Sequence, residues 1–423
     1  MYFIGIDFGT SGARCCVINT EGAIIAEDTR DFGTLEDYER AGIWREALWD
    51  LVATLPPAIR TQLSDIALDG TSGTVLACDE ELNPRHPPLL YNDDRAVDEA
   101  ALIAKTAIPG HPAAAVTSGL AKVLWLKKRL GLTGARLYLN QADWLSGLLT
   151  GRVGMTDYHN ALKMGLDLDD LKWPTWVEYL VDVDTLPIPV APGSRLATVS
   201  RPRARYLGVN PGCMVHAGTT DSIAAFLAAG VNRSGDAVTS LGSTLVLKLL
   251  SDTRVESTEH GVYSHWFGGR WLAGGASNAG GAVLRQFFDD RQLAALSEKI
   301  DPAVASPLDY LPLPKPGERF PVNDPALAPR LTPRPADDAE FLHGLLESLA
   351  RIEARGYGLL AELGATPLGR VDTAGGGAHN PVWTRIRERR LGVPVARAAH
   401  TEAAYGAALL ARDGQQRFAS PAA

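Results

Sequence analysis

The sequence is poor in cysteine and has no long apolar run. Its four cysteines, at positions 15, 16, 78 and 213, are spaced like neither metal ligands nor a disulfide framework, so we expect reduced structural thiols. The longest uninterrupted apolar stretch, residues 223–231, is far shorter than the roughly 20 residues that a membrane helix needs. Asp7 and Arg14 interrupt what would be the apolar core of a signal peptide. We therefore expect a cytoplasmic protein without a membrane partner.

Positive charge is also in short supply. Lysine and arginine number 41 against 49 acidic residues, which gives a net charge of −8 and no global basis for binding nucleic acid. Apolar residues at 46% and charged residues at 21% are typical of a folded globular chain. The 423 residues correspond to two or three domains.

The two usual nucleotide-binding signatures are absent from the sequence. A Rossmann loop needs Gly-x-Gly-x-x-Gly opening a helix, and neither residues 8–12 nor residues 375–377 have that spacing. A Walker loop ends in Gly-Lys-Ser/Thr, a tripeptide that does not occur here. A nucleotide site in this chain would have to be built differently.

Two glycine-rich hairpins offer such an alternative. Apolar, β-prone segments flank Gly9-Thr10-Ser11-Gly12 near the start of the chain and Leu241-Gly242-Ser243-Thr244 further on. Consecutive backbone N–H groups in a tight turn, with hydroxyl donors, form an anion site. Asp7 ends the first strand, and a carboxylate beside phosphate requires a cation, which makes it a Mg²⁺ candidate. Taken singly, each turn is equally consistent with a plain β-hairpin.

The motifs along the chain resemble those of the FGGY carbohydrate kinases, members of the actin/hexokinase/Hsp70 superfamily. They occur in family order across nearly the whole chain: Asp7-Phe8-Gly9-Thr10-Ser11-Gly12, residues 122–126, residues 142–161, Gly218-Thr219-Thr220-Asp221, residues 241–244, Gly317-Glu318-Arg319-Phe320-Pro321, residues 375–383 and residues 402–411. The sixth of these, residues 317–321, lies inside a proline-rich stretch, residues 302–335, which the resemblance turns from a possible linker into an expected ordered loop.

The resemblance implies an α/β fold of two actin-like (ribonuclease H-like) domains with an inter-domain cleft for ATP. The N-terminal domain would span residues 2–228 plus 402–421 and carry the sugar site, the first phosphate loop and the catalytic aspartate. The C-terminal domain, residues 229–401, would carry the second phosphate loop and the adenosine site.

The same resemblance implies roles for individual residues. Asp221 would be the general base, with Asp7 and Thr10 as further catalytic residues and Asp7 holding Mg²⁺ through water. ATP would be bound by Thr10, Ser11, Gly242, Ser243, Thr244, Gly281, Gly376, Gly377, Asn380 and Trp383, with Gly280 beside Gly281.

The sugar site departs from the pattern of many xylulose-type members. These carry a Gln and a His after an early strand, where this chain has Asp69-Gly70-Thr71-Ser72-Gly73. That difference and the short chain resemble the compact D-ribulose kinase branch of cyanobacteria and plants. By that resemblance Asp7, Ser72 and Asp221 contact the sugar. Asp93 is a fourth candidate, for which a solvated charge cluster is an equal alternative.

We therefore predict an ATP- and Mg²⁺-dependent kinase, monomeric or homodimeric, that phosphorylates a small ketose, D-ribulose before the others. D-xylulose, L-ribulose and glycerol are the rival substrates. An actin-fold ATPase or binding module without sugar chemistry is the rival from another class.

Overall fold

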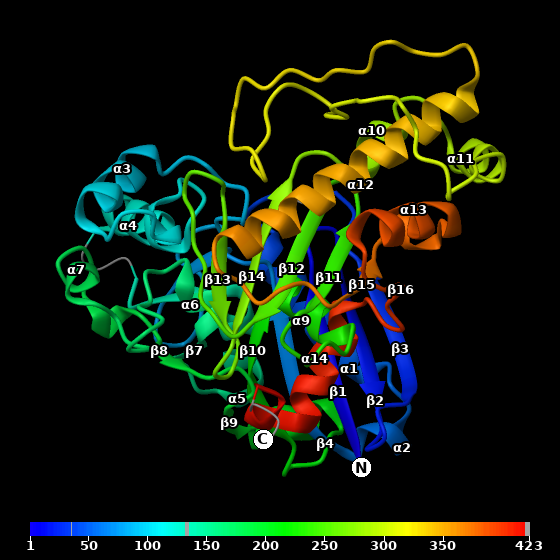
Figure 1. The fold of residues 1–423 in the computed structure, drawn as a ribbon. Helices are drawn as coiled ribbons and strands as arrows, with labels where there is room; N and C mark the ends of the chain where they lie inside the picture. The colour runs from blue at the N-terminus through cyan, green and yellow to red at the C-terminus, as the bar shows by residue number, and fades with distance from the viewer. Residues whose placement is uncertain (35, 132–134, 419–423) are drawn as a thin grey trace. The chain divides into compact units, whose positions relative to one another are not determined.

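The computed structural model describes residues 1–34, 36–131 and 135–418, and the chain divides into two compact units (Figure 1). The first unit takes in Met1–Ala228 and the chain from Glu402 onward, and the second is Ala229–Thr401. The end of the expected N-terminal domain, residues 419–421, lies outside the described residues. Each unit is described by itself below.

A six-stranded mixed sheet forms the centre of the first unit. The order of its strands is β3 (Ile24–Asp31), β2 (Gly12–Ile18), β1 (Tyr2–Phe8), β4 (Leu63–Gly70), β10 (Met214–Thr220) and β9 (Arg195–Thr198). The first three strands form the expected antiparallel meander, whereas β4 and β10 run parallel to β1. The carboxyl ends of β1, β4 and β10 therefore meet at one edge of the sheet.

Helices and two short strand pairs complete this unit. The strand pairs are β5 (Val75–Cys78) with β6 (Leu137–Asn140), and β7 (Met155–Asp157) with β8 (Ile188–Val190). The helices are α1 (Arg40–Ala53), α2 (Pro57–Arg60), α3 (Val97–Thr106), α4 (Gly119–Leu130), α5 (Gln141–Thr150), α6 (Tyr158–Leu162), α7 (Thr175–Glu178), α8 (Arg201–Leu207), α9 (Asp221–Ala228) and α14 (Ala403–Asp413).

The last helix, α14, packs closely on elements from the start of the chain and on α9 (Figure 1). A Cβ atom at Gly406 would lie only 1.8 Å from the carbonyl oxygen of Ala224 in α9. A side chain at that position would force the two helices apart. The alanine-rich sequence of α14 thus lets it join the unit formed by residues 1–228.

The second unit repeats the plan of the first. The order of its sheet is β13 (Tyr263–Trp266), β14 (Trp271–Ser277), β12 (Leu245–Ser251), β11 (Asp236–Leu241), β15 (Arg370–Ala374) and β16 (Val395–Arg397). Strands β11, β12 and β14 are antiparallel, and β15 and β16 run parallel to β11. Its helices are α10 (Gly281–Leu284), α11 (Asp290–Ser297), α12 (Asp338–Glu362) and α13 (Pro381–Leu391).

The proline-rich stretch before α12 is an ordered loop, as expected. Backbone bridges join Leu311 to Arg330 and Glu318 to Asp324, and Phe320 is fully buried in the core of the second unit. The four cysteines are free and buried, as the sequence predicted, and burial raises the pKa of Cys213 to about 12. No helix of the described residues combines the length and the apolarity needed to cross a membrane.

Candidate active site

Three aspartates lie where β1, β4 and β10 end: the predicted Asp7 and Asp221, and Asp69. Asp7 on β1 pairs in register with Asp69 on β4, and Thr219 on β10 pairs with the same Asp69. Asp221 follows two residues after Thr219 and is the first residue of α9. Parallel strands deliver their carboxyl ends to one edge, so Asp7 and Asp221 lie on either side of Asp69.

The first phosphate hairpin joins β1 to β2 at the same edge. The backbone N–H of Gly9 donates to the carbonyl oxygen of Gly12 at 3.0 Å, which closes the turn. Thr10 and Ser11 are exposed at the tip, while Gly12 is buried. Their hydroxyl and N–H groups are therefore accessible to a ligand, which is the arrangement that an anion-binding turn requires.

Asp7 is held by an arginine that the sequence reading did not assign. The Asp7 side chain is almost buried, and Nη1 of the half-exposed Arg14 lies 3.2 Å from its Oδ2 atom. The two residues are opposite each other in the β1–β2 register. Arg14 thus brings a positive charge next to the first phosphate hairpin.

Asp69 is the main residue that the sequence reading missed. Its side chain is fully buried, and no described residue donates a hydrogen bond to either carboxyl oxygen. Burial raises the pKa of Asp69 well above its ordinary value, and the neighbouring carboxyl groups of Asp7, Asp221 and Asp157 raise it further. The available signal was the copy of the first hairpin, since Asp69-Gly70-Thr71-Ser72-Gly73 repeats its letters after another strand.

The strand ends suit a magnesium ion held mostly through water. The carboxylate of Asp7, which lies near the end of β1 beside the first hairpin, supplies the oxygen chemistry that Mg²⁺ prefers. Within the described residues, no group of three or more His, Cys, Asp or Glu side chains is placed to hold a metal by itself. Phosphate and water oxygens would have to provide most ligands, which is the usual manner of Mg²⁺ binding.

The Asp221 carboxylate bonds to the backbone of its own helix and influences the ionisation of its neighbours. Its Oδ1 atom accepts a hydrogen bond from the backbone N–H of Ser222 at 2.6 Å. The side chain is partly exposed. Its charge adds to the effect of burial in raising the pKa of Asp69. At Lys163 it opposes burial, which lowers the pKa of that lysine. The exposed part of this carboxylate is accessible to a ligand at the strand ends.

The predicted sugar loop, residues 71–74, is held rigidly by buried polar side chains. Thr71 donates to Oε1 of Gln141 from its backbone nitrogen at 3.0 Å and from its hydroxyl at 3.1 Å. The Lys122 ammonium group donates to the carbonyl oxygen of Gly73 at 2.7 Å. Ser72 sits in the middle of this loop and keeps part of its surface exposed.

Asp93 is mostly enclosed and forms an ion pair with an exposed arginine. Its side chain is 13% exposed and pairs with Arg95 Nη2 at 2.7 Å. Its charge also acts on Lys122, where burial lowers the lysine pKa to about 7 and Asp93 opposes that change. Asp93 is thus connected to the sugar loop through Lys122.

The second phosphate hairpin joins β11 to β12 in the other unit. Here the backbone N–H of Gly242 donates to the carbonyl oxygen of Thr244 at 3.1 Å, much as Gly9 does in the first hairpin. Gly281 and Ala282 donate in turn to the carbonyl oxygens of Gly242 at 2.8 Å and Ser243 at 3.1 Å. Gly281 therefore holds the hairpin through its backbone, and Gly280 precedes it in the chain.

The predicted adenosine motif begins next to this hairpin. A Cβ atom at Gly377 would lie 2.7 Å from the side chain of Leu241 and 2.6 Å from the Trp383 ring. Asn380 caps α13 by accepting from the backbone N–H groups of Val382 and Trp383, each at 3.0 Å. Trp383 is a core residue, and its indole N–H has no acceptor among the described residues. Of the four predicted adenosine residues, Gly376 is exposed, Gly377 and Asn380 are partly exposed, and Trp383 is buried.

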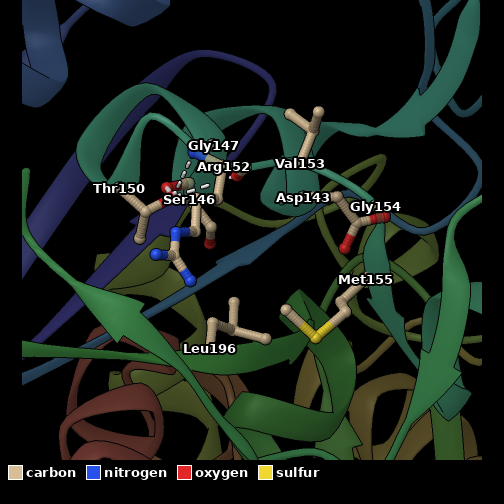
Figure 2. Close-up of a pocket in the computed structure, with 9 residues that line it drawn as sticks. All are labelled: Asp143, Ser146, Gly147, Thr150, Arg152, Val153, Gly154, Met155 and Leu196. Carbon is tan, nitrogen blue, oxygen red and sulfur yellow. Dashed lines mark hydrogen bonds between the residues drawn. The ribbon is translucent and has the colours of Figure 1, made fainter.

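A separate small hollow lies along α5 and contains none of the predicted site residues. Figure 2 shows its lining: Asp143, Ser146, Gly147, Thr150, Arg152, Val153, Gly154, Met155 and Leu196. Enclosure by protein raises the pKa of Asp143 to about 8, although one side of this residue faces the hollow. We assign this hollow no ligand.

Comparisons with known proteins agree with this arrangement. The N-terminal domain model of the FGGY family of carbohydrate kinases matches residues 2–228, and the C-terminal domain model of that family matches residues 237–412. A xylulose kinase from Staphylococcus xylosus is 24% identical over 99% of this chain and 92% of its own length.

Solved structures share the fold. A structure described as a xyloylose kinase from Brucella ovis has a TM-score of 0.87 at 21% identity, covering all of this chain and 93% of the other. A xylulose kinase from Rhodospirillum rubrum has a TM-score of 0.84 at 20% identity, covering 99% of this chain and 92% of the other. The predicted fold class, two actin-like α/β domains, is confirmed.

An enzyme that transfers phosphoryl groups to alcohols is the class that the fold and these motifs define. The chain belongs to the FGGY family of carbohydrate kinases. The ordered set of motifs was thus a correct indicator of the family, while the narrower resemblance to a D-ribulose kinase branch stays a prediction.

Proposed function

We propose that this carbohydrate kinase transfers the γ-phosphoryl group of ATP to a hydroxyl group of a small ketose, with D-ribulose the preferred sugar. The observation that carries the proposal is the meeting of Asp7, Asp69 and Asp221 at neighbouring strand ends. Phosphoryl transfer needs a group that accepts the hydroxyl proton and a site that neutralises phosphate charge. Asp221 would accept the proton, and Arg14 together with Mg²⁺ held by Asp7 would neutralise phosphate charge.

Asp221 is proposed as the general base. Its partly exposed carboxylate would take the proton of the attacking sugar hydroxyl as the oxygen–phosphorus bond forms and ADP leaves. The contact with the Ser222 N–H fixes the carboxylate at the start of α9, so it does not need to be ordered during the reaction. This preorganisation is what positioned acid–base groups contribute.

The two hairpins are proposed as the phosphate-binding elements. Thr10 and Ser11 from the first unit, and Gly242, Ser243 and Thr244 from the second, would donate to phosphate oxygens. Asp7 would hold Mg²⁺ through water, and when bound this ion neutralises charge on the phosphates. Arg14, at 3.2 Å from Asp7, would add a second positive charge there.

Each unit is proposed to bind a different part of the two substrates. The unit formed by residues 2–228 and 402–421 would bind the sugar, the first phosphate contact and the base. The unit formed by residues 229–401 would bind the rest of ATP, with Gly376 and Gly377 contacting adenosine through their backbone. Asn380 and Trp383 would support that turn from the start of α13.

The choice of D-ribulose rests on the sugar loop. This loop offers Ser72 between two fixed neighbours and lacks the Gln and His of many xylulose-type members. Asp93, connected to the loop through Lys122, is proposed to complete the sugar contacts. D-xylulose is the second candidate, because relatives such as the Staphylococcus xylosus protein are named xylulose kinases.

A sugar panel tests the proposal. ADP release would be measured for the purified enzyme with D-ribulose, D-xylulose, L-ribulose, glycerol and gluconate, each with and without Mg²⁺. We expect the highest kcat/KM for D-ribulose and no turnover without the metal. A higher kcat/KM for D-xylulose would make D-xylulose the preferred substrate in place of D-ribulose. ADP release that no sugar stimulates would favour an ATPase or binding module instead.

A further inference from the structure

Lys163 lies near the sugar loop, and hydrogen bonds hold its backbone and the helix before it. Lys163 directly follows α6, whose first turn is capped by Asp157. The carbonyl oxygen of Lys163 accepts a hydrogen bond from the Leu120 N–H at 3.0 Å. His159 in α6 bonds through Nδ1 to the hydroxyl of Thr219 at 2.7 Å, which ties this helix to the strand that leads to Asp221.

The Lys163 side chain runs across the sugar loop towards Asp221. A Cβ atom at Gly73 would lie 3.5 Å from Cδ of Lys163, so the chain passes directly over that glycine. Its Nζ atom lies 3.4 Å from the carbonyl oxygen of Ser72. The Asp221 carboxylate acts electrostatically on the same ammonium group. The charged end of Lys163 therefore contacts the sugar loop at Ser72 and lies within the electrostatic influence of Asp221.

The neighbouring Lys122 shows what a purely structural lysine looks like here. Lys122 is fully buried, and its ammonium group donates to the carbonyl oxygens of Gly73 at 2.7 Å and Thr117 at 2.9 Å. Lys163 keeps some exposure and makes one long hydrogen bond, within the described residues, from three available donors. Burying an ammonium group with so few acceptors costs free energy unless a ligand supplies them.

The charge around Lys163 indicates what that ligand is. Carboxyl groups of Asp7, Asp69, Asp157 and Asp221 influence one another at these strand ends. Burial lowers the pKa of Lys163, and Asp221 opposes this change by stabilising the ammonium form. An anionic acid would meet this set of carboxyl groups, whereas a neutral sugar offers oxygen acceptors without repulsion.

We propose that Lys163 is a sugar-binding residue that donates a hydrogen bond to one oxygen of the ketose and so directs the attacking hydroxyl towards Asp221. This inference rests on the proposed ketose kinase function and adds a contact to it. The sugar oxygen would replace water as a second acceptor beside the Ser72 carbonyl. The lysine therefore acts as a specificity determinant for a neutral, oxygen-rich substrate.

The test compares Lys163→Met and Lys163→Arg with the wild type and with Lys172→Met, a change at an exposed lysine nine residues along the chain. Losing a hydrogen bond from a charged donor corresponds to about 10–100-fold. We expect Lys163→Met to lower kcat/KM for D-ribulose by about that factor, with the KM for ATP within about twofold. Lys163→Arg should lose less, and Lys172→Met nothing. A Lys163→Met enzyme with a sugar kcat/KM within threefold of wild type would overturn the proposal.

Ketose analogues that each lack one oxygen separate binding from folding. For the analogue without the contacted oxygen, we expect wild type and Lys163→Arg to have nearly equal kcat/KM values, because the lysine then has nothing to bind. A purely structural role would give the same loss for every analogue, and this result would reject the sugar contact even if Lys163→Met failed to fold. If the wild type is inactive with all ketoses, the proposed function is rejected, and the proposed sugar contact is rejected together with it.

Discussion

Asp7 and Asp69 occupy directly paired positions on the parallel strands β1 and β4, and Asp69 is completely buried there. Two carboxyl groups so placed repel each other when both are ionised. The protein therefore maintains an unfavourable arrangement at its proposed catalytic edge, as is common where function rather than stability determines the residues.

Replacing Asp69 by Asn should stabilise the ligand-free protein in a pH-dependent way. The pKa of Asp69 is raised on folding from an ordinary value of 3.8, so the wild type loses stability as the pH rises from that value through the folded pKa. Asn does not titrate. By urea denaturation, we expect Asp69→Asn to be more stable than wild type by about 1 kcal/mol or more at pH 8, with a smaller difference at pH 5.

Asp309→Asn is the matched control with the opposite sign. The hydrogen bond from Arg330 lowers the pKa of the exposed Asp309, so its contribution is present at high pH and is lost as the pH falls. This variant should be slightly less stable than wild type at pH 8. An Asp69→Asn variant with the same stability difference at both pH values would show that Asp69 does not carry the proton.

Removal of the proposed base should affect turnover far more than folding. We expect Asp221→Ala to lower kcat by about 10²–10⁴-fold, the range for a positioned acid or base. The loss of one cap contact to Ser222 should leave the circular dichroism spectrum unchanged. Turnover within twofold of wild type would remove Asp221 from the mechanism.

Disturbing the support of the second phosphate hairpin should weaken ATP binding selectively. A Cβ atom at Gly281 would lie 2.7 Å from the Gly242 carbonyl oxygen, so Gly281→Val must displace the hairpin. We expect the KM for ATP to rise by about 10-fold or more, the effect of one lost interaction of roughly 1.4 kcal/mol, with little change in the KM for the sugar. A lower apparent kcat with both KM values unchanged would instead indicate partial unfolding.

The core of the second unit contains an ion pair whose disruption should be costly. Arg387 donates to Glu353 from Nε at 2.6 Å and from Nη2 at 2.7 Å, and both side chains are buried. Arg387→Met leaves a buried carboxylate without its partner, which costs about 3–5 kcal/mol. Arg355→Met breaks the exposed pair with Glu362 on the same helix and should cost less than about 1 kcal/mol. Similar melting temperatures for the two variants would contradict this expectation.

Local sequence patterns determined much of the fold. Alternating apolar segments and glycine turns predicted the first meander and both hairpins, because a turn's geometry depends on its own few residues. The apolar residues between positions 341 and 352 recur at helical spacing, which indicates a helix where the structure has α12, Asp338–Glu362. The family followed from motifs in a fixed order, each too weak by itself.

Only the tertiary structure showed which polar groups share an environment. Asp69 opens a copy of the first hairpin's letters and Lys163 lies in no motif, but the importance of both comes from what surrounds them after folding. The short strands β6 to β9 are likewise fixed by pairing with distant segments. A pKa shift and a strand partner both depend on residues far along the chain, which a local pattern does not contain.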